Sequence, residues 1–190
     1  MNKTLLSLLI FILLISLNIK AETFSLFGVN IGSKLNQELN PNWTWGQVDG
    51  PMSGYYISPP VTNSLMKDYI AEVHREKETI NAIWGYSVDL NNEKQCLKIR
   101  LVFESAIKKT NIDKRQNYNQ ISSQFPSVNT RVIKYKSKVE GDDKEYVFSL
   151  ICQELNNKYH LNIGVEKKYT IIDVIEEMIK DVDKIDISGL

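Results

Sequence analysis

The sequence contains few of the residues, and none of the short motifs, on which enzyme chemistry most often depends. Among 190 residues there are two histidines and two cysteines, with no G-x-S-x-G turn and no C-x-x-C pair. The 23 basic and 23 acidic side chains cancel, so charge does not favour a nucleic acid as the partner. These absences favour binding over catalysis, and the sequence predicts neither a cofactor nor a metal site.

The one long apolar run lies at the N-terminus. Lys3 precedes an apolar run from Leu5 to Leu17, and Ala21 then supplies the small residue after which a signal peptidase cuts. This run is shorter than the ~20 residues that cross a bilayer; an uncleaved anchor is the alternative. We expect residues 1–21 to be a signal peptide and residues 22–190 to form a single domain with no membrane span, in a periplasmic or secreted protein.

Export changes how the two cysteines are interpreted. In an oxidising compartment an isolated pair is most simply a disulfide, and two separate buried thiols are the alternative. Cys96 lies on the apolar stripe of a helix predicted over 91–109, and Cys152 lies on the apolar side of a strand predicted over 145–155. The sequence therefore predicts a disulfide that joins this helix to the sheet.

Apolar periodicity predicts a chain rich in strands. Alternation with a period of two predicts strands over 24–32, 68–76, 80–88, 131–139, 145–155 and 159–167. Steps of three and four residues predict helices over 91–109 and 170–182. The segment 40–60 reads as loop-rich, with Tyr55-Tyr56-Ile57 as a candidate short strand, and 111–129 reads as a loop or a short helix. This order indicates an α+β fold, with an antiparallel sheet packed against two helices in two β-β-β-α halves.

Two surfaces are candidates for binding. The first is a predicted aromatic loop that holds Trp43, Trp45, Tyr55 and Tyr56. Large, rigid, amphipathic rings make good contact anchors, although such a loop also folds down over a sheet as a small satellite core, which is the interpretation we favour for the rings.

The second candidate is basic. Residues 94–144 hold 12 basic and 5 acidic side chains, and Lys134, Lys136 and Lys138 alternate along one predicted strand. Such a row suits an anionic envelope component or an acidic protein surface. The favoured alternative is that the lysines protect an exposed sheet edge from pairing with other chains.

The remaining titratable residues do not form a recognisable catalytic or metal-binding set. His74 and His160 fall on the polar sides of their predicted strands and are expected to face solvent. Carboxylate pairs are attractive for a glycosidase that acts on cell-wall sugars, but no pair stands out in the sequence. The acidic C-terminus, with Asp181, Asp183 and Asp186, does not follow the calcium-loop pattern.

Several short features together resemble a scattered group of small, uncharacterised exported proteins of Gram-negative bacteria. They lie in order along most of the chain after residue 21, and they are Phe27-Gly28 with Gly32, Tyr56 before Pro59-Pro60, Tyr69, Cys96 and the ending Asp186-Ile187-Ser188-Gly189-Leu190. The resemblance implies a periplasmic or secreted bacterial protein. It carries no catalytic residue and no ligand.

The sequence thus predicts an exported binding module that acts as an inhibitor, an immunity-type protein or an envelope assembly factor. Its expected partner is another envelope protein or an anionic envelope component. The alternative is an envelope hydrolase that acts on cell-wall or lipid substrates without a recognisable motif.

Overall fold

A computed structural model describes residues 23–46, 51–110, 117–125 and 129–168 of the chain. The predicted signal peptide, the predicted helix over 170–182 and the C-terminal Asp186–Leu190 ending lie outside the described residues. Within the described ranges, no helix has the length and apolar character needed to cross a bilayer.

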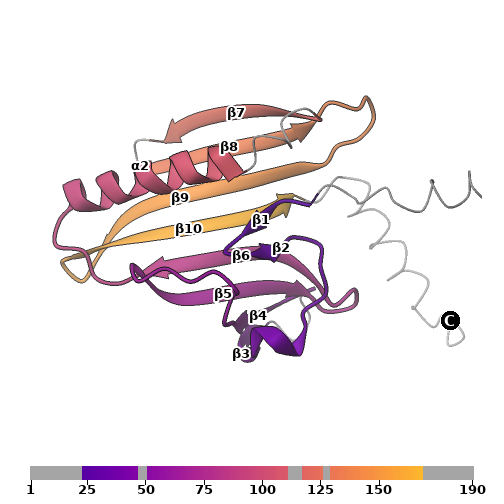
Figure 1. Ribbon diagram of the computed structural model, residues 1–190, viewed down its shortest axis with the longest axis horizontal. Helices are drawn as coiled ribbons and strands as arrows, with labels where there is room; N and C mark the ends of the chain where they lie inside the picture. The colour runs from indigo at the N-terminus through magenta and orange to yellow at the C-terminus, as the bar shows by residue number, and fades with distance from the viewer. Residues whose placement is uncertain (1–22, 47–50, 111–116, 126–128, 169–190) are drawn as a thin grey trace, which may run out of the picture.

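One large antiparallel sheet dominates the described structure (Figure 1). Its eight strands lie in the spatial order β3-β4-β5-β6-β10-β9-β8-β7. Their bounds are β3 Asn42–Gly46, β4 Met52–Tyr56, β5 Met66–His74, β6 Thr79–Ser87, β7 Tyr118–Phe125, β8 Thr130–Ser137, β9 Glu145–Leu155 and β10 Lys158–Lys168. Neighbouring strands in each half are also neighbours in sequence, and the two halves meet where β6 pairs with β10.

The helix α2 (Glu93–Thr110) connects the two halves and contacts β9 and β10 on one face of the sheet. Asn92 accepts a hydrogen bond from the Gln95 amide through its side-chain oxygen, at 2.9 Å, and so caps the helix N-terminus. The predicted disulfide is present: Cys96 of α2 and Cys152 of β9 are joined at an S–S distance of 2.07 Å, with their Cα atoms 5.9 Å apart. Both residues are buried, as their positions on the apolar faces indicated.

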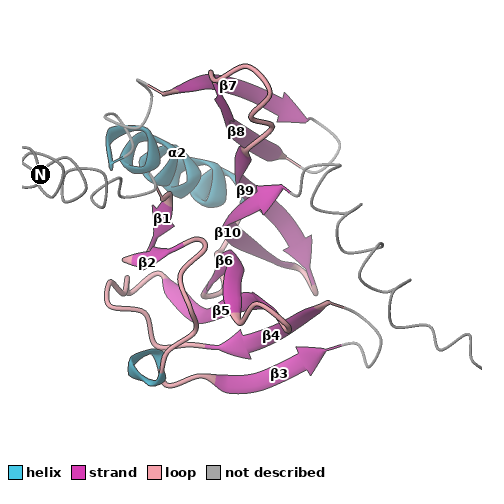
Figure 2. Ribbon diagram, turned by 90° about the vertical axis from the view of Figure 1, so that its right-hand side faces the viewer, coloured by secondary structure: helices cyan, strands magenta, loops and turns pink. Residues whose placement is uncertain are grey.

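A small hairpin of β1 (Ser25–Leu26) and β2 (Val29–Asn30) lies on the same side of the sheet as α2 (Figure 2). Its turn inserts Phe27 over Gly85, where an added Cβ would lie 2.7 Å from the Phe27 ring. The preceding Phe24 is fully buried against Tyr135 and Tyr146, with ring centroids 4.8 and 4.4 Å apart. This hairpin therefore completes the aromatic core beside α2.

The expectation of a sheet packed against two helices in two β-β-β-α halves is wrong. Among the described residues, α2 is the one α-helix, a short 3-10 turn occupies Gln37–Leu39, and each half of the sheet has four strands. Residues 118–125 form β7 instead of a loop or short helix. The segment 40–60, expected to be loop-rich, holds two paired strands, β3 and β4; the candidate strand at Tyr55 and Tyr56 is part of β4.

Candidate functional site

The sheet face opposite α2, called the outer face here, carries a mixture of aromatic and charged side chains. Because side chains alternate between the two faces of a strand, the register places rows of residues across it. The rows at the centre are Glu72–Ala82–Glu166, Ile70–Trp84–Gly164 and Asp68–Tyr86–Asn162, each running from β5 through β6 to β10. Residues from distant parts of the sequence thus meet on one surface.

The Trp84 ring lies across the neighbouring strand β10. A Cβ added at Gly164 would lie 2.2 Å from Cε3 of the Trp84 indole, so the ring occupies the space above this glycine. The absence of a side chain at Gly164 therefore allows the indole to lie close to the sheet.

An open pocket of about 410 Å³, called the outer pocket here, opens beside these rows. Its size falls in the range of small-ligand sites. It is lined by Tyr56, Lys67, Asp68, Ile70, Tyr86, Ser87, Asp89 and His160. The pocket thus combines two phenol rings with two carboxylates, one lysine and one imidazole, and these groups come from β4, β5, β6, β10 and the segment after β6.

Two carboxylates, one lysine and one histidine line the outer pocket, and several groups near it are electrostatically perturbed. His160 Nδ1 lies 3.9 Å from Asp89 Oδ1 at the pocket wall. Burial raises the pKa of Tyr86, and the nearby Glu72 carboxylate and Tyr56 hydroxyl raise it further. Burial also raises the pKa of Glu72. The Trp84 indole partly offsets this rise, and the Glu166 carboxylate adds to it. A perturbed carboxyl beside a pocket is a common feature of functional sites.

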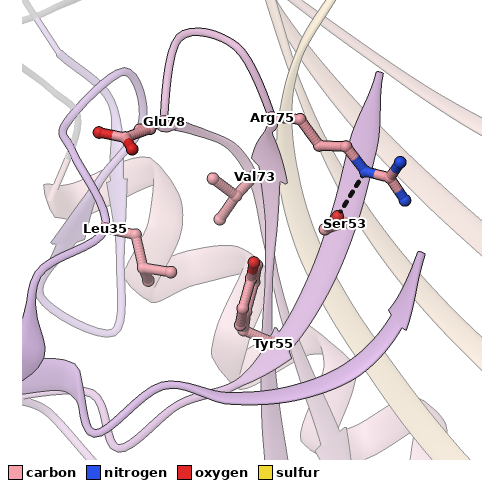
Figure 3. A pocket seen from close by; sticks show the side chains of 6 residues that line it. All are labelled: Leu35, Ser53, Tyr55, Val73, Arg75 and Glu78. Carbon is pink, nitrogen blue, oxygen red and sulfur yellow. Dashed lines mark hydrogen bonds between the residues drawn. The ribbon is translucent and has the colours of Figure 1, made fainter. Parts of the chain in front are cut away.

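A second open pocket, called the inner pocket here, lies on the α2 side of the sheet and has a volume of about 480 Å³ (Figure 3). It is lined by Leu35, Ser53, Tyr55, Val73, Arg75 and Glu78. Arg75 Nε donates a hydrogen bond to Ser53 Oγ at 2.8 Å, and Glu78 forms an exposed ion pair with Lys34 at 3.7 Å. In Figure 3, Arg75 and Glu78 lie at opposite ends of the pocket.

The predicted aromatic loop is instead a hairpin whose two tyrosines line different pockets. Trp43 pairs with Tyr55, and Trp45 pairs with Gly54; the side chains of both tryptophans lie outside what the structure describes. Tyr55 lines the inner pocket and Tyr56 lines the outer pocket. Consecutive residues of β4 point to opposite faces, so the two tyrosines do not form one patch.

The lysine row lies on β8 and the turn after it. Lys134 and Lys136 both form ion pairs with Glu145 of β9, at 3.3 and 3.2 Å. Lys138 is exposed just beyond the end of β8. The interpretation of these lysines as edge protection is wrong, because β8 lies between β7 and β9. That this row meets an anionic partner stays a prediction.

The two histidines differ from the expectation that both face solvent. His74 is only 1% exposed, and its Nδ1 accepts a hydrogen bond from the Lys77 amide at 3.3 Å. His160 is half-buried at the wall of the outer pocket. Sequence reasoning did not place His160 in the outer pocket, because it treated polar residues on alternating strands as solvent-facing. In the parts of the chain that the structure describes, no three metal-ligating side chains converge.

The comparisons with known proteins add no relative. The chain matches no protein-family model, and the searches of curated sequences and of solved structures found no match.

Proposed function

We propose that this protein is an exported protein of a Gram-negative bacterial envelope that acts by binding another protein. The roles that fit are an inhibitor, an immunity-type protein or an envelope assembly factor. The N-terminal pattern of a signal peptide supports export, and the Cys96–Cys152 disulfide is compatible with an oxidising compartment. The outer pocket supports binding as the mode of action.

The observation that carries this proposal is the pairing of phenol rings with carboxylates in the outer pocket. Tyr56 is 43% exposed, and it lines the pocket together with Tyr86, Asp68 and Asp89. Aromatic faces attract cations within about 6 Å of the ring centroid, and carboxylates form charge-assisted hydrogen bonds with guanidinium or ammonium groups. A basic side chain of the partner, arginine above all, fits this set as an anchor.

A defined probe tests this chemistry. We expect the ring resonances of Tyr56 and Tyr86 to shift when Nα-acetylarginine amide is titrated into the protein and followed by NMR. The corresponding citrulline derivative keeps the shape but lacks the charge, so it should produce far smaller shifts. Asp68→Asn should weaken the response, because it removes one carboxylate from the pocket wall.

Asp143→Asn is the matched control, since it removes one exposed carboxylate in the turn between β8 and β9. It should leave the titration unchanged. Equal shifts with the arginine and citrulline probes, or an undiminished response in Asp68→Asn, would show that the pocket does not recognise a basic group.

One observation favours a second candidate, an envelope hydrolase that acts on cell-wall polysaccharide. Glu72 and Glu166 lie on either side of Ala82 in one row of the outer face, and the Glu166 carboxylate is near enough to raise the pKa of Glu72. Burial raises the pKa of Glu72, whereas Glu166 is ion-paired with Lys168 at 2.7 Å. An inverting glycosidase uses one carboxyl group as the acid and a second as the base, on opposite faces of the sugar.

Release of reducing ends from purified cell-wall polysaccharide distinguishes the two candidates. Turnover that Glu72→Gln and Glu166→Gln each abolish would support the hydrolase. Absence of turnover by the wild-type protein would reject it and leave the binding proposal standing.

A further inference from the structure

The strand β7 forms one edge of the large sheet and has few of the features that protect such edges. Its eight residues, Tyr118-Asn-Gln-Ile-Ser-Ser-Gln-Phe125, contain no charge, no proline and no glycine. Its pairing with β8 runs from Tyr118–Ser137 to Phe125–Thr130 without a bulge. Exposed edges are usually made short, charged or bulged because an uncovered edge pairs with other chains.

The opposite edge differs in these respects. β3 has five residues, and its register with β4 shifts between Trp43 and Trp45. A short, bulged strand is a poor template for strand addition. The two edges of the sheet are therefore not equivalent, and β7 is the one suited to pairing.

The direction of the backbone groups along β7 follows from two hydrogen bonds. The Lys138 amide donates to the Asn117 carbonyl at 3.0 Å on the β7 side of β8, and the Cys152 amide donates to the Asn129 carbonyl at 3.3 Å on the β9 side. Directions alternate along an antiparallel strand, so Ile121 and Ser123 direct their N–H and C=O groups towards β8. Gln120, Ser122 and Gln124 direct theirs away from the sheet.

The side chains along this edge suit an apolar contact. Ile121 and Phe125 lie on the outer face and are 46% and 49% exposed. Single exposed apolar residues are common, but here two lie on a strand whose backbone is also open to pairing in the described structure.

We propose that β7 pairs antiparallel with β7 of a second copy of this chain, about a two-fold axis that passes beside Ile121. In this register Gln120 lies opposite Ser122 of the second copy and exchanges backbone hydrogen bonds with it. Ile121 then faces Ile121 of the second copy on the outer face, at the close spacing of a non-hydrogen-bonded pair. The two eight-stranded sheets become one continuous sheet.

The absence of charge on β7 favours a second copy as the occupant, and the position of α2 permits its approach. A strand without charge meets its own copy without like-charge repulsion, and Lys134, which lies opposite Ile121 on β8, is paired with Glu145. The helix α2 contacts β9 and β10, so it does not block the approach to β7. Isologous two-fold contacts are the commonest way in which identical chains associate.

The test is the oligomeric state of the full exported chain, measured by sedimentation velocity over a range of protein concentrations. We expect a concentration-dependent dimer that Ile121→Lys abolishes, because it places two charges against each other at the axis. Ser122→Pro should abolish it too, since it removes an outward N–H while leaving the β7–β8 hydrogen bonds in place. Val102→Lys is the matched control: it places the same charge on α2 at a residue that is 66% exposed.

Amide hydrogen exchange supplies a second readout that does not depend on variants. Exchange at Gln120, Ser122 and Gln124 should slow as the protein concentration rises, whereas exchange at Ile121 and Ser123 should not change. A monomer at every concentration would overturn the proposal, even if β7 then pairs with an extended segment of another protein. A dimer that persists in both Ile121→Lys and Ser122→Pro would overturn it as well.

Discussion

The contact between Trp84 and Gly164 makes a sharp prediction about stability. A Cβ at position 164 would lie 2.2, 2.4 and 2.5 Å from three atoms of the indole, whereas ordinary van der Waals contact begins near 3.4 Å. The ring must therefore move by about 1 Å or rotate away when Gly164→Ala is made. Overpacking of this kind typically destabilises by ~1–3 kcal/mol. Alanine itself is favoured over glycine within a strand by ~0.5–1 kcal/mol, so the net loss should be about 1 kcal/mol, within a range of ~0–2.5 kcal/mol.

The sign of this effect should depend on the indole. In a Trp84→Ala background the clash is absent, and Gly164→Ala should then stabilise the protein by ~0.5–1 kcal/mol. Urea unfolding of the four proteins, followed by far-UV circular dichroism, gives the coupling free energy between the two positions. A loss in Gly164→Ala that is the same in both backgrounds would refute the packing described here.

Two further predictions concern the disulfide and Glu72. Joint replacement of Cys96 and Cys152 by alanine should lower the free energy of unfolding by about 4 kcal/mol, because the disulfide closes a loop with a sequence separation of 56; a loss under ~1 kcal/mol in urea unfolding contradicts this. The pKa of Glu72 is raised in the folded state, so its ionisation opposes folding as the pH rises through and above the unfolded value of 4.5. Glu72→Gln should therefore be more stable than wild type at pH 7 and lose this advantage below about pH 4; an advantage that is equal at both pH values is inconsistent with it.

The strands at the centre of the sheet were predictable because they are half-buried. Residues 68–76 and 80–88 alternate clearly, and they correspond to β5 and β6. The helix predicted over 91–109 corresponds to α2. Its buried residues recur at steps of three and four, as in Cys96, Arg100, Glu104 and Ile107.

The edge strands could not be recognised in the same way. In β7, Ile121 and Phe125 alternate onto a face where both are exposed, so polar and apolar side chains follow no burial pattern. In β3, the bulge between Trp43 and Trp45 shifts the alternation by one residue. Weak packing thus removes the periodic signal on which strand prediction depends.

The outer pocket depends on contacts that no local pattern encodes. His160 is far from Tyr56 and Asp68 in the sequence, and it meets them because β6 pairs with both β5 and β10. The pairing of β6 with β10 joins the two halves of the sheet, which α2 separates in the sequence. Tyr56 was a candidate contact residue from its ring alone, whereas the residues around it emerge only from the topology.

The outer pocket is proposed to anchor a protein partner through a basic side chain. The most direct measurement is affinity capture from a native envelope extract with the wild-type protein, Tyr56→Ala, Asp68→Asn and the control Asp143→Asn. We expect one stoichiometric protein partner that the wild type and Asp143→Asn retain equally and that Tyr56→Ala and Asp68→Asn release. A partner retained equally by all four proteins, or no stoichiometric partner for the wild type, would contradict the claim.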